Sequence, residues 1–243
     1  MANGTSGTKG GSSQAAAPAP APVQAAPPVQ AAPPANATFS TMTDADAAAM
    51  VAQYDSYTDP DVVAARKLYI SDNNPNGDGY SHAQNLNYKL DNGIPLNANE
   101  QFIDDNIQYG MHALGKNVKL VRYCHDDIIQ QLGVKDYSKL SEAQLKKQLV
   151  GKTFKLKSYM STSYNDKSSP FAPGQAAGGG REVKMGINAG ASTMGILGAK
   201  KQTEVILNKG TNAIVKNVYF DGSTATPRNK GSRPRIAFEI ETY

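Results

Sequence analysis

In the first half of the chain, apolar residues recur at the spacing of a helix rather than of a strand. Phe102, Ile103, Ile107 and Met111 fall on one helical face. The segment Asn97–Glu100 before them has the spacing of a capping box, in which the first and fourth side chains satisfy each other's backbone N–H groups. The pattern therefore predicts a helix that begins just after Asn97.

Similar start signals occur at four further points in the sequence. Each combines a Ser, Thr or Asp cap with a favourable residue in the first helical turn. Asn92-Gly93 supplies one stop signal, because glycine readily adopts the left-handed conformation that ends a helix. The expected helices run from Asp44 to Tyr57 after Thr43, from Pro60 after Asp59, from His82 to about Asn92 after Ser81, and from Glu142 after Ser141.

The second half of the chain changes to short apolar runs separated by clusters of Gly, Pro and Asn, which are typical of strands. Because the helices come first and the strands mostly later, we expect an α+β domain rather than alternating βαβ units. The expected strands are Val118–Tyr123, Lys155–Tyr159, Glu182–Ile187, Glu204–Leu207, Ala213–Tyr219 and Arg235–Glu241.

The first 38 residues have none of this periodicity. Residues 1–14 are mostly Gly, Ser, Thr and Ala, and residues 15–35 contain only Ala, Pro, Val and Gln. Such segments cannot bury a core, so we expect residues 1–38 to be a disordered tail. Residues 39–243 are then long enough to form a single domain with one substantial core.

Composition excludes several classes of protein and leaves others open. The 243 residues carry a net charge of +4, and the basic segment 228–235 has no interleaved aromatic residues, so we expect a solvated loop rather than nucleic-acid binding. We expect no membrane span, because no apolar run reaches about 18 residues. No standard secretory signal is recognisable, which allows cytosolic action, packaging in a virion or a specialised secretion route. Cys124 is the one cysteine, so we expect neither an intrachain disulfide nor a cysteine-based zinc site.

Two other motifs have ordinary structural interpretations that we favour. The segment Asp72–Asp78 imitates the start of a calcium-binding loop, but Ala83 stands where the bidentate Glu is needed. Cys124 beside His125 is a conceivable nucleophile, although a small buried residue is the more common explanation. We expect no metal.

Three polar groups stand out as an ordered set along the predicted strands. Arg122 ends the apolar run KLVRY, where an arginine needs an anionic partner, and a pyrophosphate would provide one. Ser161-Thr162-Ser163 directly follows the apolar run LKSYM. Gln202 and Glu204 are two residues apart at the entrance to the run EVIL, so period-2 alternation points them to the same side.

The order Arg, Ser-Thr-Ser, then Gln-x-Glu resembles the mono-ADP-ribosyltransferase exoenzymes, the family of binary-toxin enzymatic components and Rho-modifying exoenzymes. The resemblance spans roughly residues 50–243. Asn87-Tyr88-Lys89-Leu90 is similar to the family's Asn-x-x-Leu motif, but Asp91 stands where an Arg is usual, which weakens one expected phosphate contact. The resemblance implies helices packed on a mixed, mostly antiparallel β core of two sheets.

It also implies that NAD is the substrate and that a protein of unknown identity accepts the ADP-ribose. Glu204 and Ser161, with Gln202, are the implied catalytic residues. Glu204 would stabilise the oxocarbenium-like ribose as nicotinamide leaves, and Gln202 would select the acceptor. The implied NAD-binding residues are Asn87, Arg122, Tyr123, Ser161, Thr162, Ser163, Phe171 and Arg181.

Three questions stay open at this point. Within the family, Glu at the position of Gln202 accompanies arginine acceptors, so Gln202 implies a different acceptor residue. An NAD glycohydrolase, in which water is the acceptor, or a non-catalytic binding module remains an alternative. Glu239-Ile240-Glu241 also fits Glu-x-Glu, but it lacks the Gly-Thr turn that follows Glu204, so we expect it to be structural.

Overall fold

The computed structural model describes residues 37–72, 75, 77, 79–125, 127–166, 182–199, 203–221 and 235–243. It confirms the α+β class: helices occupy most of the first half and strands most of the second. The helices are α1 (Asp44–Gln53), α2 (Pro60–Tyr69), α3 (His82–Asn92), α4 (Ala98–Tyr109), α5 (Asp127–Gln131) and α6 (Glu142–Leu149). The strands are β1 (Ser40–Thr41), β2 (His112–Ala113), β3 (Val118–His125), β4 (Thr153–Lys155), β5 (Met160–Ser163), β6 (Glu182–Ala189), β7 (Met194–Leu197), β8 (Glu204–Leu207), β9 (Asn212–Asp221) and β10 (Arg235–Thr242).

The predicted helix starts are confirmed at the level of the caps. Thr43, Ser81, Asn97 and Ser141 each form a complete capping box, and Asp59 accepts hydrogen bonds from the first turn of α2. Helix α3 ends at Gly93, whose φ of +65° is the left-handed conformation that glycine adopts without strain. Helix α1 is shorter than predicted, because the chain tightens into a 3₁₀ turn at Asp55–Tyr57.

The predicted strand Lys155–Tyr159 is wrong. Strand β4 ends at Lys155 and β5 begins at Met160. The residues between them form a corner, at which Leu156 exchanges backbone hydrogen bonds with Thr211 and Gly210. The corner moves the chain from the partner of β4, which is β9, to the partner of β5, which is β8.

The described strands form one hydrogen-bonded path in the order β2-β7-β8-β5-β3-β6-β10-β9-β4, with β1 added beside β3. Most neighbours are antiparallel, and β10–β6 and β1–β3 are parallel. The two groups of strands expected from the family resemblance are joined through a single registered pair, Val121 with Ser163. Strands β3 and β5 therefore diverge on either side of this pair.

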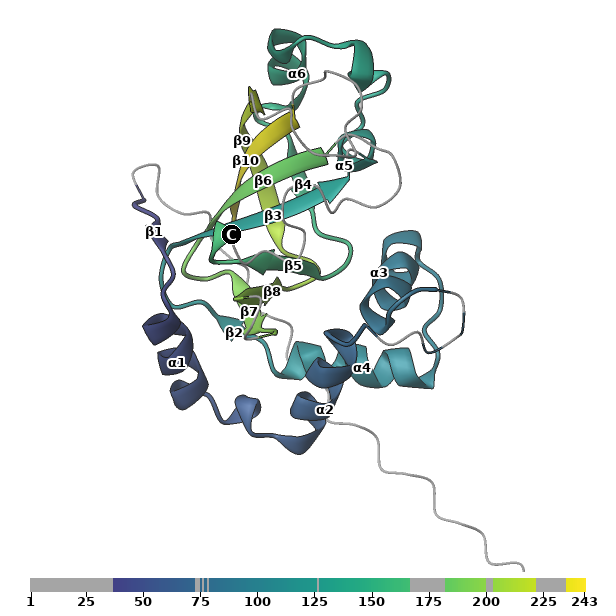
Figure 1. Ribbon diagram of the computed structural model, residues 1–243, viewed down its shortest axis with the longest axis vertical. Helices are drawn as coiled ribbons and strands as arrows, with labels where there is room; N and C mark the ends of the chain where they lie inside the picture. Colours follow the sequence, from purple (N-terminus) through teal and green to yellow (C-terminus); the bar gives the residue numbers. More distant parts are fainter. Residues whose placement is uncertain are drawn as a thin grey trace, which may run out of the picture.

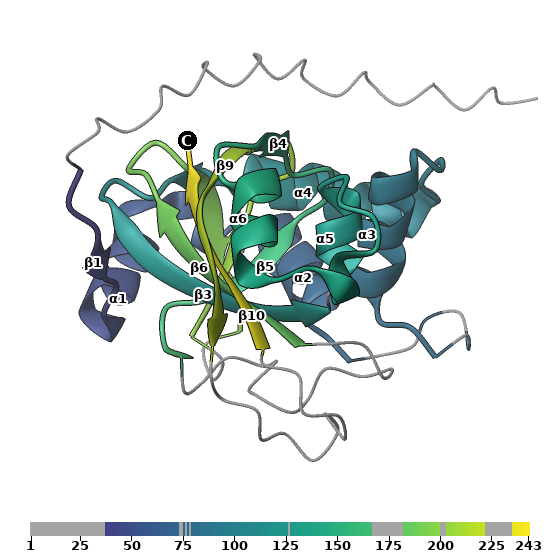
Figure 2. The same ribbon diagram turned by 90° about the horizontal axis from the view of Figure 1, so that it is seen from above.

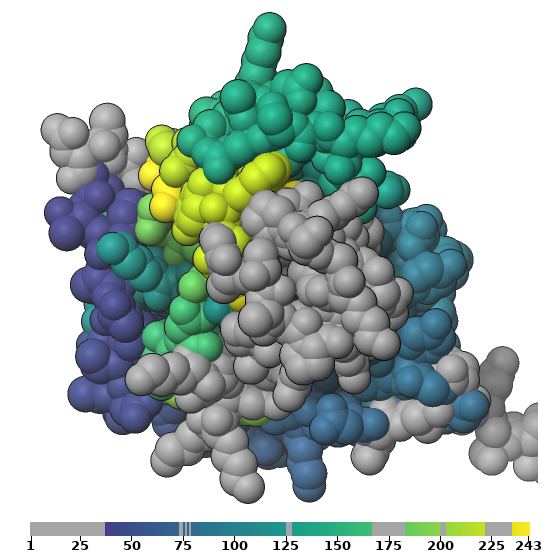
Figure 3. Space-filling view, turned by 45° about the horizontal axis from the view of Figure 1, so that its top comes forward, coloured from purple at the N-terminus to yellow at the C-terminus, as the bar shows by residue number. Residues whose placement is uncertain are grey.

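The helices flank the two ends of this path. Figure 1 shows α1–α4 gathered around the end formed by β2, β7 and β8, and α5 and α6 at the opposite end. Figure 2, seen from above, places α6 beside β9 and β10, and the space-filling view in Figure 3 shows these strands directly against the α5–α6 segment. One hydrophobic cluster joins residues from both groups of strands and from α1–α6. No helix in the described ranges is long and apolar enough to cross a bilayer.

Candidate functional site

Arg122 and Ser161 meet where β3 and β5 diverge. The Arg122 guanidinium is half-buried, and its Nη1 donates to the backbone oxygen of Ser161 over 2.6 Å. Ser161 lies opposite Ile206 of β8, and Ser163 lies opposite Glu204. The pairing therefore brings the predicted arginine, the serines and the glutamate to neighbouring positions, although they are far apart in sequence.

Glu204 is the first residue of β8 and is only 6% exposed. Its Oε2 accepts a hydrogen bond from the backbone N–H of Ala199 at 2.8 Å. The carboxylate lies so close to the Gly198 backbone that a Cβ at that position would overlap Oε2. The residues that follow β7 thus fix the orientation of Glu204, and Gly198 is a site residue that the sequence patterns did not reveal.

Thr203, immediately before Glu204, has a φ of +48°, which is unusual for a β-branched residue. Such a conformation costs roughly 1–2 kcal/mol. The Oγ1 of Thr203 lies 2.6 Å from the Oγ of Ser163, so a hydrogen bond between β5 and the entrance of β8 holds the strained residue in place. Backbone strain of this kind is common at functional sites.

The other two hydroxyls of the Ser-Thr-Ser motif differ from Ser161 in what they contact. The buried Thr162 donates to the backbone oxygen of Val205, so its hydroxyl bridges β5 and β8. Ser163 donates to the backbone oxygen of Asn165 in addition to its contact with Thr203. Both hydroxyls therefore connect β5, which carries Ser161, to the start of β8, where Glu204 lies.

Tyr69, at the end of α2, is a second residue that sequence reasoning missed. Its ring is 1% exposed, and its hydroxyl accepts a hydrogen bond from Asn87 Nδ2 at 3.1 Å. Burial raises the pKa of Tyr69, and hydrogen bonds from Asn87 and Ser161 to its oxygen oppose this shift. The charge of Glu204 raises the pKa further, and that of Arg122 lowers it. The Tyr69 hydroxyl is therefore a neutral group at the centre of the predicted site.

Asn87 links α3 to this centre. Besides Tyr69, its amide contacts the backbone of Tyr159, accepting from the N–H and donating to the oxygen, both at 3.2 Å. Tyr159 in turn packs edge-on against Tyr69, with ring centroids 5.8 Å apart. The predicted Asn87 thus supports the position of Tyr69.

Tyr123, another predicted residue, belongs to a separate polar cluster. Its hydroxyl donates to Asp166 at 2.6 Å, and Lys184 also pairs with Asp166. Burial, together with the hydrogen bond to Asp166, raises the pKa of Tyr123 to about 12. Arg235 lies over the same ring, so two cations flank Tyr123.

The remaining predicted residues either lie outside the described ranges or lie in the structure away from Glu204. Phe171, Arg181 and Gln202 lie outside the described residues. Glu241 on β10 faces Lys216, with 3.8 Å between their charged atoms, and pairs in register with Ile214 of β9. Within the described ranges, no group of three or more His, Cys, Asp or Glu side chains is placed to hold a metal ion.

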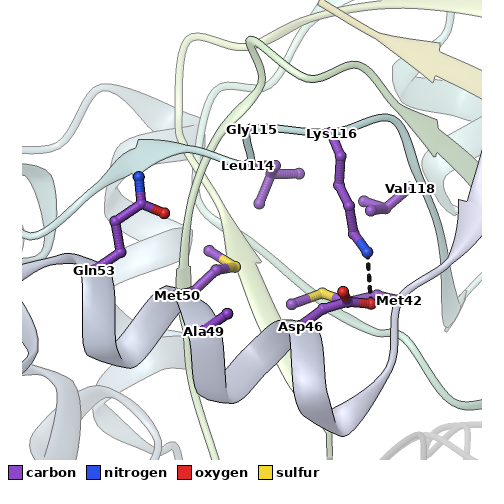
Figure 4. Close-up of a pocket in the computed structure, with 9 residues that line it drawn as sticks. All are labelled: Met42, Asp46, Ala49, Met50, Gln53, Leu114, Gly115, Lys116 and Val118. Carbon is purple, nitrogen blue, oxygen red and sulfur yellow. Dashed lines mark ion pairs between the residues drawn. The ribbon is translucent and has the colours of Figure 1, made fainter.

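A hollow of about 190 Å³ lies between α1 and the segment that leads into β3 (Figure 4). Met42, Met50, Leu114 and Val118 contribute its apolar wall, and the ion pair of Lys116 with Asp46 closes one side. The residues of the predicted site do not line this hollow. It reflects how α1 rests on the sheet.

Comparisons with known proteins identify the family of this chain. The family model described as "ADP-ribosyltransferase exoenzyme" matches residues 78–230, more than half of the chain. The chain belongs to the ADP-ribosyltransferase exoenzyme family. No curated protein matches this exoenzyme by sequence.

Solved structures show the same fold at low sequence identity. An ADP-ribosyltransferase from Clostridium botulinum is 19% identical, with a TM-score of 0.54, 84% of this chain covered and 98% of that one. A protein from S. aureus, solved with NAD, is 16% identical, with a TM-score of 0.51 and coverage of 85% and 99%. The enzymatic component of the C2 toxin from Clostridium botulinum is 14% identical, with a TM-score of 0.57, but the match spans 83% of this exoenzyme and only 48% of the toxin component.

These findings confirm the predicted class of enzyme. The exoenzyme is an NAD-dependent mono-ADP-ribosyltransferase, and its fold is that of the solved toxin enzymes.

Proposed function

We propose that this protein transfers ADP-ribose from NAD to a protein side chain other than arginine, with Glu204 as the catalytic carboxylate. The observation that carries the proposal is the fixed position of that carboxylate: buried, bonded through Oε2 to Ala199, and adjacent to Ser163. Within the described residues Oε1 has no hydrogen-bond donor, so it is available to the 2′-hydroxyl of the nicotinamide ribose.

The reaction breaks the bond between C1′ of the ribose and N1 of the nicotinamide. Both electrons leave with the nicotinamide ring, which becomes neutral, and positive charge develops on the ribose. A preorganised carboxylate stabilises this charge, as in glycoside cleavage. The acceptor atom then bonds to C1′ and loses its proton.

Other residues position the substrate. Arg122 binds the pyrophosphate, because a planar guanidinium matches phosphate oxygens with two parallel hydrogen bonds. Ser161 supports the ribose and Tyr69 holds Ser161 in place, which the contact network around the Tyr69 hydroxyl supports. Phe171, Arg181 and Tyr123 take the nicotinamide and phosphate contacts that the family resemblance implies.

The proposal for the type of acceptor residue is based on Gln202. A carboxamide cannot pair electrostatically with a guanidinium, whereas it can donate to and accept from an amide. With Gln rather than Glu two residues before Glu204, we infer an acceptor other than arginine, with asparagine as the first candidate.

The full chain incubated with NAD labelled in the adenosine half tests this proposal. We expect nicotinamide release and label on protein, with mass spectrometry placing ADP-ribose on a residue other than arginine. Release matched by free ADP-ribose, without protein label, would instead show a glycohydrolase. The absence of release would favour a non-catalytic module, and efficient labelling of arginine would overturn the acceptor assignment.

A further inference from the structure

Arg66 on α2 is a charged side chain that the proposed chemistry does not use. It is half-buried, yet the described part of the chain supplies no carboxylate to it. Its contact is aromatic: the Cζ atom lies 5.2 Å from the ring centroid of Tyr57. Burial lowers the pKa of Arg66, which is the direction expected of a desolvated cation without a counter-charge.

Tyr57 holds this guanidinium beside the strand that leads to the catalytic carboxylate. The Tyr57 hydroxyl accepts a hydrogen bond from the N–H of Leu197 at 3.0 Å, and its ring is buried against His112 at 5.2 Å. Leu197 ends β7, and the next two residues, Gly198 and Ala199, contact the Glu204 carboxylate. Arg66 therefore lies over the ring of a tyrosine whose hydroxyl is bonded to the last residue of β7, two residues before Ala199.

Arg66 lies outside the group of residues assigned to NAD. The next turn of the same helix carries Tyr69, whose pKa is dominated by burial and, among charges, by Glu204 and Arg122. Arg122, rather than Arg66, is the cation near α2 that we assign to NAD binding. A guanidinium stacked on a ring uses its face for that contact and keeps its N–H edge for a planar, bidentate partner.

We propose that Arg66 binds an acidic side chain of the protein acceptor, so that the enzyme selects target residues flanked by Asp or Glu. The inference rests on the proposed function, because it needs a protein acceptor at Glu204. A carboxylate of the acceptor would give the half-buried guanidinium a counter-charge that the described residues do not supply.

The test uses the full-length chain, labelled NAD and matched synthetic peptides. Each peptide carries one central Asn, Gln, Ser, Thr, Cys or Arg, flanked by Glu, by Lys or by neutral residues. The wild type is expected to label Glu-flanked peptides about fivefold to tenfold faster than Lys-flanked ones. The variant Arg66→Glu is expected to reverse this preference, and Arg66→Lys to retain part of it.

Lys67→Glu is the matched control, because it makes the same charge change at an exposed neighbour on α2. It is expected to behave as the wild type. Nicotinamide release without peptide should be equal in all four proteins, since Arg66 is placed outside the NAD site.

The outcomes separate this inference from the proposed function. Wild-type protein that releases no nicotinamide contradicts the proposed function itself. If nicotinamide is released and the peptides are labelled at equal rates, the assignment of Arg66 is overturned. Release with free ADP-ribose and no labelled peptide would show a glycohydrolase and contradict the proposed function, and the assignment of Arg66 would fall with it. Equal loss of nicotinamide release and peptide labelling in Arg66→Glu would move Arg66 into NAD binding and also overturn it.

Discussion

At the scale of single residues, the orientation of Glu204, the proposed catalytic carboxylate, depends on neighbours that carry no catalytic chemistry of their own. Glu204 could be proposed from the order of motifs, because a carboxylate is visible in the residue type. Gly198 and Tyr69 could not be identified in this way, because their importance comes from tertiary contacts with Glu204 and Ser161. A glycine shortly before two lysines and a tyrosine at a helix end each have ordinary explanations in a sequence.

Substituting Gly198 by Ala should disable the enzyme without unfolding it. The new Cβ would overlap the Glu204 carboxylate, which must rotate away and lose its bond to Ala199. We expect nicotinamide release to fall by about 10²-fold, the typical effect of losing one preorganised electrostatic group. Thermal melting should stay within a few degrees of the wild type, and a variant with full activity would show that Glu204 is not held as described.

Replacing Tyr69 by Phe removes one hydroxyl from the centre of the site and leaves the ring packed on Tyr159. Asn87 Nδ2 and the Ser161 side chain lose a partner, so Ser161 should be less well oriented. We expect a loss of kcat of about tenfold, with a smaller change in KM for NAD. A change confined to thermal stability would leave Tyr69 with a purely structural role.

At the scale of elements, local signals predicted the helices well and the strands unevenly. Caps act within four residues, so Thr43, Ser81, Asn97 and Ser141 were readable in sequence. The corner before β5 was not readable, because the apolar run continues through it and the change of strand partner is a long-range event. Strand β7 was missed for a similar reason: its glycine suggests a turn, and only its pairing with β8 and β2 makes it a strand.

The stacking of His112, in β2, on Tyr54, at the end of α1, makes the free energy of unfolding depend on pH. His112 stacks on Tyr54 with ring centroids 3.8 Å apart, and burial lowers the pKa of His112 to about 4. The unfolded chain binds this proton near pH 6.5, so the stabilisation present above pH 6.5 is lost as the pH falls toward 4. The loss amounts to about 3 kcal/mol at most.

Melting curves of the wild type and of His112→Phe between pH 7 and 4.5 test this dependence. The wild type should lose several degrees more than the variant, whose ring keeps the stack but cannot be protonated. Asp46 titrates below this pH range, because its hydrogen bond with Lys116 lowers its pKa to about 2. Parallel curves for the two proteins would remove His112 as the cause.

At the scale of the whole molecule, the boundary of the catalytic unit is a prediction from composition. Strand β1 (Ser40–Thr41) pairs with β3, and Met42, directly after β1, is buried in the core. A chain that begins at Phe39 should therefore melt and release nicotinamide as the full chain does. A chain that begins at Thr43 is the matched control: it lacks β1 and Met42 and should melt about 5 °C lower. Equal melting of these two shortened chains would show that β1 does not contribute.

Two glutamates fit the same short motif, and the proposed site requires Glu204 to be the catalytic one. Glu204 is buried beside Ser163, whereas Glu241 on β10 pairs with Lys216 on β9. The most direct measurement is nicotinamide release by Glu204→Gln and Glu241→Gln, with NAD affinity measured by calorimetry. We predict that Glu204→Gln loses about 10²–10³-fold in rate at nearly unchanged affinity and that Glu241→Gln stays close to the wild type. The opposite result, with Glu241→Gln inactive and Glu204→Gln active, would contradict the site described above.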